Sequence, residues 1–159
     1  MRTARALILV TLLLLTPLSL MATPAMATDT SVNVDTTWSG DVVLTGNVTV
    51  MNGSTLTLSP GTTVDGGDGY WIRVDGTLDA SNAHFFSSQT PVTAGSHGAG
   101  LWTGIYVASK GHAVLNDVVV ENAKTAIKVD GQLSAFKTTI KDSYIGINVI
   151  GSADIDTIT

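Results

Sequence analysis

The chain has 159 residues, 44% of them apolar and none of them cysteine. One domain with its own core is therefore expected, while disulfides, thiolate metal sites and cysteine nucleophiles are excluded. The formal charge is −5, and beyond residue 27 there are 13 acidic but only 6 basic side chains, a net −7. Such an acidic chain is a poor partner for nucleic acid, whose phosphates attract basic surfaces.

The first 27 residues have the pattern of a secretory signal peptide. Arg2 and Arg5 precede an apolar run that ends at Leu20, and a segment of small residues closes with Ala27. A basic start, an apolar stretch of about 15 residues and a small-residue end are typical of such peptides. A membrane-spanning helix needs about 20 apolar residues. We predict a signal-peptide helix over residues 1–27 with cleavage after Ala27, a secreted or cell-surface location, and no membrane span in the mature chain.

The segment that follows changes from irregular to alternating. Residues 28–37 are polar without a regular period, so a flexible linker is predicted that leads to Trp38. Residues 41–50 alternate between apolar and polar on either side of a glycine turn, which predicts short strands. Asn47 and Asn52 each begin an Asn-x-Ser/Thr sequon and are glycosylation candidates in a host that has the machinery.

One short phrase occurs three times in the second half of the chain, at steps of 22 and 20 residues: Ile105-Tyr106-Val107, Ile127-Lys128-Val129 and Ile147-Asn148-Val149. A glycine turn and a second apolar pair follow each phrase, and residues 71–80 are an upstream copy. A third apolar position lies five residues beyond the second pair in three copies: Phe85, Val120 and Ile140. A period near 20 built from three alternating segments predicts a solenoid in which each repeat is one coil.

The repeat predicts an all-β fold, a right-handed parallel β-helix of about five coils of 20–24 residues that spans residues 38–159. Like strands of successive coils would stack about 4.8 Å apart, so columns can be listed. Two inward columns are Val50, Val74, Val107, Val129, Val149 and Leu58, Ala80, Leu115, Ala135, Ile155. The last copy stops in mid-strand at Thr159, so we expect a C-terminal truncation, with further coils or a partner to cap the apolar end.

Candidate ligand-binding residues come from an outward column and from an interruption of the repeat. The outward column is Thr49, Arg73, Tyr106, Lys128, Asn148. With the nearby Trp71, its aromatic and cationic members are suited to an acidic sugar, because sugars stack on aromatic faces and cations pair with carboxylates; plain surface exposure is the alternative. A glycine-rich insertion between Phe86 and Ile105 adds His97 and Trp102, since solenoid insertions often form the functional side.

The acidic residues do not predict a catalytic or metal centre. Calcium prefers six to eight oxygen ligands, but the acids do not gather in one outward column. Asp75 and Asp130 follow the first strand at equivalent places with the Tyr106 coil between them, and most Asp-Gly pairs are explained by tight turns. The glycine-aspartate segment at residues 65–69 is a single short copy. No catalytic residue and no metal ligand is assigned, and calcium is left open as a cofactor.

Two stretches resemble the right-handed parallel β-helix proteins of the pectate-lyase-like superfamily, with residues 38–159 covered. The first runs from Trp102-Thr103-Gly104-Ile105 into the apolar and asparagine pattern of residues 113–122, and the second is the opening segment, residues 46–64. The resemblance implies the fold more strongly than an activity, because one fold hosts many functions.

Three functions are compatible with these patterns. The leading hypothesis is an exported surface or extracellular module, not an enzyme, that binds polysaccharide or a cell-surface partner. The alternative is a calcium-dependent polysaccharide lyase or hydrolase of the pectate-lyase-like type, with its site partly beyond residue 159. The third is a structural stalk or surface-layer spacer.

Overall fold

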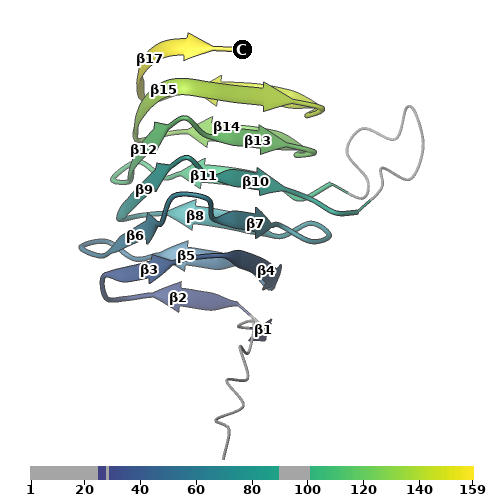
Figure 1. The fold of residues 1–159 in the computed structure, drawn as a ribbon. Helices are drawn as coiled ribbons and strands as arrows, with labels where there is room; N and C mark the ends of the chain where they lie inside the picture. Colours follow the sequence, from purple (N-terminus) through teal and green to yellow (C-terminus); the bar gives the residue numbers. More distant parts are fainter. Residues whose placement is uncertain (1–24, 28, 90–100) are drawn as a thin grey trace, which may run out of the picture.

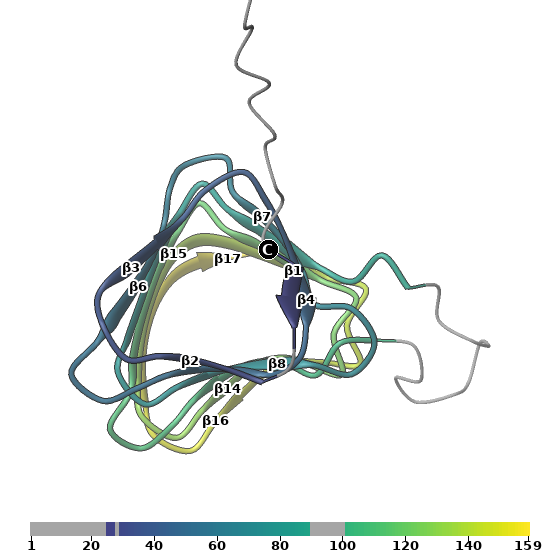
Figure 2. The ribbon, with the colours of Figure 1, turned by 90° about the horizontal axis from the view of Figure 1, so that it is seen from below.

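The computed structural model describes residues 25–27, 29–89 and 101–159. Within these ranges the chain forms a parallel β-solenoid of about six turns, one turn more than the sequence predicts (Figure 1). Seen along its axis, the stack has a three-sided outline around a filled interior (Figure 2). Each side is a parallel sheet, and we name the three sides sheets A, B and C.

The strands follow one another around the three sides in a fixed order. Sheet B contains β2 (Thr30–Val32), β5 (Val48–Val50), β8 (Trp71–Val74), β11 (Gly104–Val107), β14 (Thr125–Val129) and β16 (Ile145–Val149). Sheet C contains β3 (Thr36–Trp38), β6 (Thr55–Leu58), β9 (Thr77–Ser81), β12 (His112–Asn116), β15 (Gln132–Lys141) and β17 (Ser152–Ile158). Sheet A contains β1 (Ala25–Ala27), β4 (Asp41–Thr45), β7 (Thr63–Asp65), β10 (His84–Phe86), β13 (Val119–Glu121) and the second half of β15.

The predicted linker over residues 28–37 is wrong, because this segment holds two strands of the first turn. β2 pairs with β5, and β3 pairs with β6. Val32 and Trp38 point inward and are buried. The Asp35 carboxylate also accepts a hydrogen bond from the Thr55 N–H at 2.9 Å, which ties this turn to the next.

The predicted columns are confirmed by the strand register. Val50, Val74, Val107 and Val129 pair in succession along sheet B and are fully buried. Phe85 pairs with Val120, and Val120 with Ile140, as the constant five-residue offset predicts. Burial of one such side chain contributes about 1.5–3 kcal/mol, so the columns supply most of the driving force for the stack. In the sixth turn the inward residues become partly exposed, since they face the open end of the stack.

Two sets of corners hold the turns at the strand spacing. Between sheets B and C lie Gly76, Gly111, Gly131 and Gly151, where a Cβ would overlap carbonyl oxygens of the preceding turn. Between sheets C and A the backbone adopts positive φ, at Gly40, Gly61, Asn82, Asp117, Lys137 and Thr157. Glycine and asparagine tolerate that conformation, which explains why turn residues repeat with the coils.

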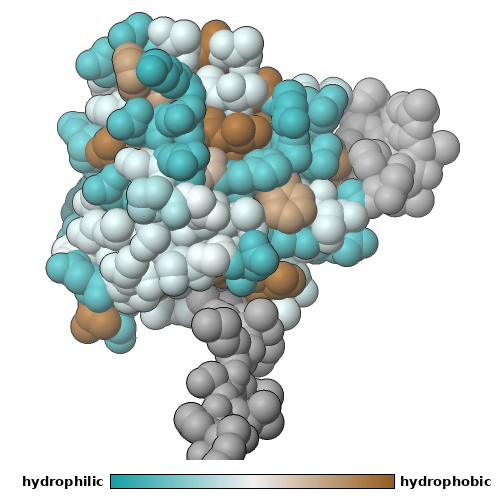
Figure 3. All heavy atoms as spheres, viewed as in Figure 1, coloured by the Kyte–Doolittle hydropathy of each residue, from teal (hydrophilic) through white to brown (hydrophobic). Residues whose placement is uncertain are grey.

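The outer surface is dominated by hydroxyl, amide and charged residues, with apolar ones scattered among them (Figure 3). Within the described ranges, no helix is long and apolar enough to cross a bilayer. β1, which forms the end of the predicted signal peptide, pairs with β4. Residues 1–24 lie outside the described residues, so the signal peptide and its cleavage site stay predictions.

Candidate functional site

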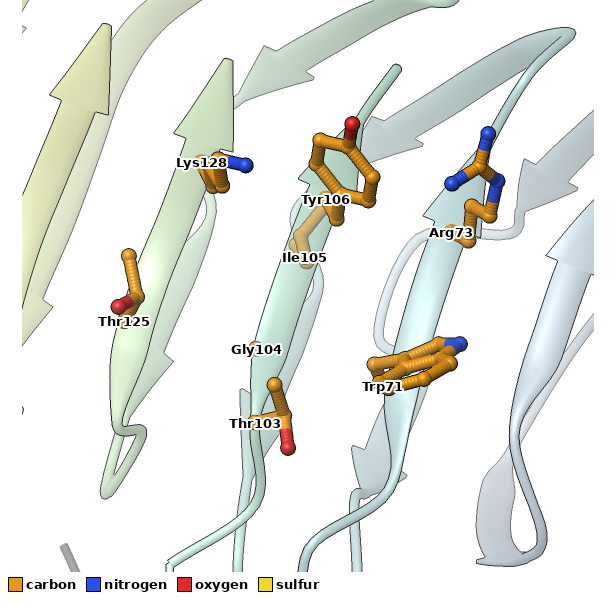
Figure 4. A pocket seen from close by; sticks show the side chains of 8 residues that line it. All are labelled: Trp71, Arg73, Thr103, Gly104, Ile105, Tyr106, Thr125 and Lys128. Atoms are coloured by element: carbon orange, nitrogen blue, oxygen red, sulfur yellow. The ribbon is translucent and has the colours of Figure 1, made fainter. Parts of the chain in front are cut away.

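The outward column of sheet B brings together three of the predicted binding residues. Arg73 on β8 pairs with Tyr106 on β11, and Tyr106 pairs with Lys128 on β14. Each lies between two inward valine or isoleucine residues, so strand alternation directs all three side chains to the outer face. The column is therefore a direct product of the repeat, and Figure 4 shows the three side chains in a row.

The Tyr106 ring lies between two cations. The Arg73 Cζ atom is 5.1 Å from the ring centroid, and the Lys128 Nζ atom is 4.5 Å from it. Both are within the range of a cation–π contact, which contributes about 0.5–1 kcal/mol at an exposed position. The stack orders two long side chains that would otherwise be mobile.

Two carboxylates complete what we call the charged array, consisting of Asp75, Arg73, Tyr106, Lys128 and Asp130. Arg73 donates from Nε and Nη2 to the two oxygens of Asp75, both at 2.7 Å. The Tyr106 hydroxyl donates to Asp130 Oδ2 at 2.6 Å, and Lys128 Nζ lies 3.5 Å from the same oxygen. Two positive and two negative groups give the array no net charge.

The array shifts the pKa of its cation and of its phenol. The hydrogen bond to Asp75 raises the pKa of Arg73 against a smaller opposing effect of burial. The hydrogen bond to Asp130, and then burial, raise the pKa of Tyr106. Tyr106 therefore stays a protonated donor at any physiological pH.

A hollow of about 260 Å³ opens beside the array, between the Trp71 ring and the start of β14 (Figure 4). Gly104 forms part of its lining; its φ is +111° and a Cβ there would overlap the Thr125 carbonyl oxygen. The backbone path thus requires glycine next to Trp71, and the missing side chain leaves space. Thr103 and Thr125 line the hollow further along. Its volume is below the roughly 300–1,000 Å³ typical of enclosed small-molecule sites, so it suits one ring of a longer ligand.

Trp71 is the most accessible apolar surface of the hollow. Its side chain stands at the first position of β8 and is 41% exposed. The Trp71 N–H is held by the Asn47 side-chain oxygen at 3.3 Å. An exposed, positioned indole ring is a surface on which another flat or ring-shaped group can stack.

Trp102 does not belong to this site, contrary to the sequence-based assignment. Its side chain is completely buried, and its ring lies parallel to that of Phe85 with centroids 6.2 Å apart. The Trp102 Nε1–H donates to the Glu121 carbonyl at 3.0 Å. A large aromatic side chain where the chain re-enters the stack fills the core instead of meeting a ligand. His97 lies outside the described residues.

The two glycosylation candidates differ in accessibility. Asn52 is exposed in the turn between β5 and β6. Asn47 is only partly exposed, and its amide oxygen accepts the Trp71 N–H. A glycan at Asn47 would compete with that contact, whereas a glycan at Asn52 would not.

A second polar cluster, on sheet A, was not predicted. Glu121 Oε1 lies 2.9 Å from His84 Nε2, and Glu121 Oε2 lies 2.5 Å from Lys141 Nζ. Burial alone would raise the pKa of Glu121, but the contacts with Lys141 and His84 outweigh it and lower the pKa. The 20-residue step from Glu121 to Lys141 was available as a signal, because these residues pair in register.

The structure also explains the aspartate-glycine segment at residues 65–69. The buried Asp65 accepts hydrogen bonds from the Gly67 and Ser88 N–H groups, at 2.9 and 3.1 Å. This carboxylate therefore holds a turn together. In the part of the chain that the structure describes, no three His, Cys, Asp or Glu residues are grouped so as to hold a metal ion.

Comparisons with protein-family models, curated proteins and solved structures find no match to this chain. The geometry of the site is therefore the basis for any functional proposal.

Proposed function

We propose that this protein is an exported surface module that binds polysaccharide through the hollow beside Trp71. The observation that carries the proposal is the exposed Trp71 ring at one wall of a hollow that is also lined by Thr103, Thr125 and the charged array. In this proposal the chain is a right-handed β-helix of the pectate-lyase-like type, and the predicted signal peptide supports a secreted or cell-surface location.

The chemistry of the lining suits a sugar better than a wholly apolar ligand. One face of a sugar ring carries C–H groups that stack on an indole, while its edge carries hydroxyls. Lys128 is 41% exposed and Arg73 uses only some of its five N–H donors on Asp75, so both can donate to hydroxyls. The strands repeat about every 4.8 Å, close to the length of one β-linked hexose unit, which favours an extended chain over a single sugar.

The positions of the carboxylates favour binding over a calcium-dependent lyase. Asp75 and Asp130, which stand nearest the hollow, hold Arg73, Tyr106 and Lys128. A carboxylate engaged by a cation is a poorer calcium ligand, because the two positive charges compete for the same oxygens.

A glycan array followed by titration calorimetry with the best oligosaccharide tests the proposal. Trp71→Ala is expected to weaken binding at least tenfold, since a lost aromatic stack costs about 0.5–1.5 kcal/mol beyond the lost buried area. Phe136→Ala is the matched control, because Phe136 is 42% exposed on the outer face of sheet C. Equal effects of the two substitutions, or no glycan bound by the unmodified protein, would refute the proposal.

A further inference from the structure

The charged array is neutral because each cation already has an anionic partner. Arg73 and Asp75 form a two-bonded pair, the geometry in which a guanidinium and a carboxylate bind most strongly. Lys128 shares Asp130 with the Tyr106 hydroxyl. The side chains of Asp75 and Asp130 are 27% and 23% exposed, so both carboxylates also act on a ligand in the hollow.

This balance works against an acidic sugar. A uronate or sulfate group that approached Arg73 would have to displace Asp75 or share the guanidinium with it, and Asp75 would repel it at close range. The repulsion between two unit charges at 4 Å is about 1 kcal/mol even in water. The chain as a whole adds to this effect, with 13 acidic against 8 basic side chains.

The same balance favours a neutral sugar. A hydroxyl both donates and accepts, so it can accept from Arg73 or Lys128 while it donates to the neighbouring carboxylate. A pair of adjacent hydroxyls can thus bind without breaking an ion pair. We infer that the site takes a neutral polysaccharide and discriminates against polyuronates and sulfated glycans; this inference rests on the proposed polysaccharide-binding function.

The experiment compares neutral and acidic oligosaccharides of equal length by titration calorimetry at low and at high salt. The neutral probes are the hexasaccharides of cellulose, xylan, mannan and laminarin, and the acidic probes are hexagalacturonate and a chondroitin sulfate hexasaccharide. We expect at least one neutral probe to bind with an affinity that salt hardly changes, at least tenfold more tightly than either acidic probe. Trp71→Ala should abolish that difference.

A charge-unmasking variant tests the reason for the selectivity. In Asp75→Asn, Arg73 loses its anionic partner, so affinity for hexagalacturonate should rise roughly fivefold to tenfold at low salt and fall again at high salt. Asp79→Asn is the control, because Asp79 is an exposed carboxylate on sheet C and the substitution removes the same charge.

The outcomes separate the two proposals. Tighter, salt-sensitive binding of an acidic probe by the unmodified protein would overturn the neutral-ligand inference and leave polysaccharide binding intact. An unchanged preference in Asp75→Asn would also overturn the inference, because charge balance would then not be its cause. Binding of none of the probes, together with an empty glycan array, would overturn both.

Discussion

The glycine corners between sheets B and C permit a quantitative test of the fold. Gly131 lies between β14 and β15, and a Cβ there would overlap the carbonyl oxygens of Ala108 and Gly111 in the preceding turn. Two hydrogen bonds cross this corner: Gln132 N–H to Gly111 O at 3.0 Å, and Gly131 N–H to Val107 O at 3.2 Å. In Gly131→Ala the turns must separate locally. Loss of one or both bonds, with a buried polar group left unpaired, costs about 2–4 kcal/mol of unfolding free energy.

Urea unfolding followed by far-ultraviolet circular dichroism measures this cost. With a slope of about 2 kcal/mol/M, the midpoint of Gly131→Ala should fall by about 1–2 M. Gly146→Ala is the matched control, since Gly146 lies in β16 and its Cβ would make only an ordinary contact with Ile140 at 3.8 Å. If the two variants unfold within about 0.3 M of each other, the close approach of turns at Gly131 is not what determines this corner, and the reasoning fails.

Two further predictions concern buried polar groups. Because the pKa of Glu121 is lowered from 4.5, its contribution to stability is present above that pH and is lost as the pH falls through the lowered pKa; Glu121→Gln should therefore cost about 1–2 kcal/mol at pH 7 and less at pH 3, as measured by urea unfolding at both values. Thr138 Oγ1 is buried without a hydrogen-bond partner, so Thr138→Val should raise the unfolding free energy by about 1 kcal/mol, whereas Thr62→Val should lower it, because Thr62 Oγ1 donates to the Ser59 carbonyl at 2.6 Å. A destabilised Thr138→Val or a pH-independent effect at Glu121 would contradict these expectations.

The columns of the solenoid were predictable because two simple periods combine. Alternation along a strand places Val74, Val107 and Val129 on the inner face, and the 20-to-24-residue repeat stacks them. The same two periods place Arg73, Tyr106 and Lys128 side by side on the outer face. A column requires no knowledge of side-chain conformation, which is why the sequence predicts both the core and the main line of the candidate site.

The first turn and the role of Trp102 were not predictable from the same periods. The inward positions of β2 and β3 are partly occupied by threonine, so hydrophobic alternation is too weak there to predict strands. Backbone pairing with β5 and β6 forms these strands regardless of their polarity. Trp102 lies at the edge of the insertion, where the register is broken, and only its packing on Phe85 shows that it belongs to the core.

The contacts of Asp75 and Asp130 were also beyond the sequence, and they change how the column is understood. Stacked strands bring identical outward positions to about 4.8 Å, where two like charges repel by about 0.9 kcal/mol in water, whereas a tyrosine between them doubles the separation and halves the repulsion. Tyr106 adds two cation–π contacts, each of comparable size. The carboxylates after the strands then neutralise Arg73 and Lys128. A parallel solenoid thus favours charge balance within a column, so selectivity for a ligand falls to Trp71 and to paired donors and acceptors, not to net charge.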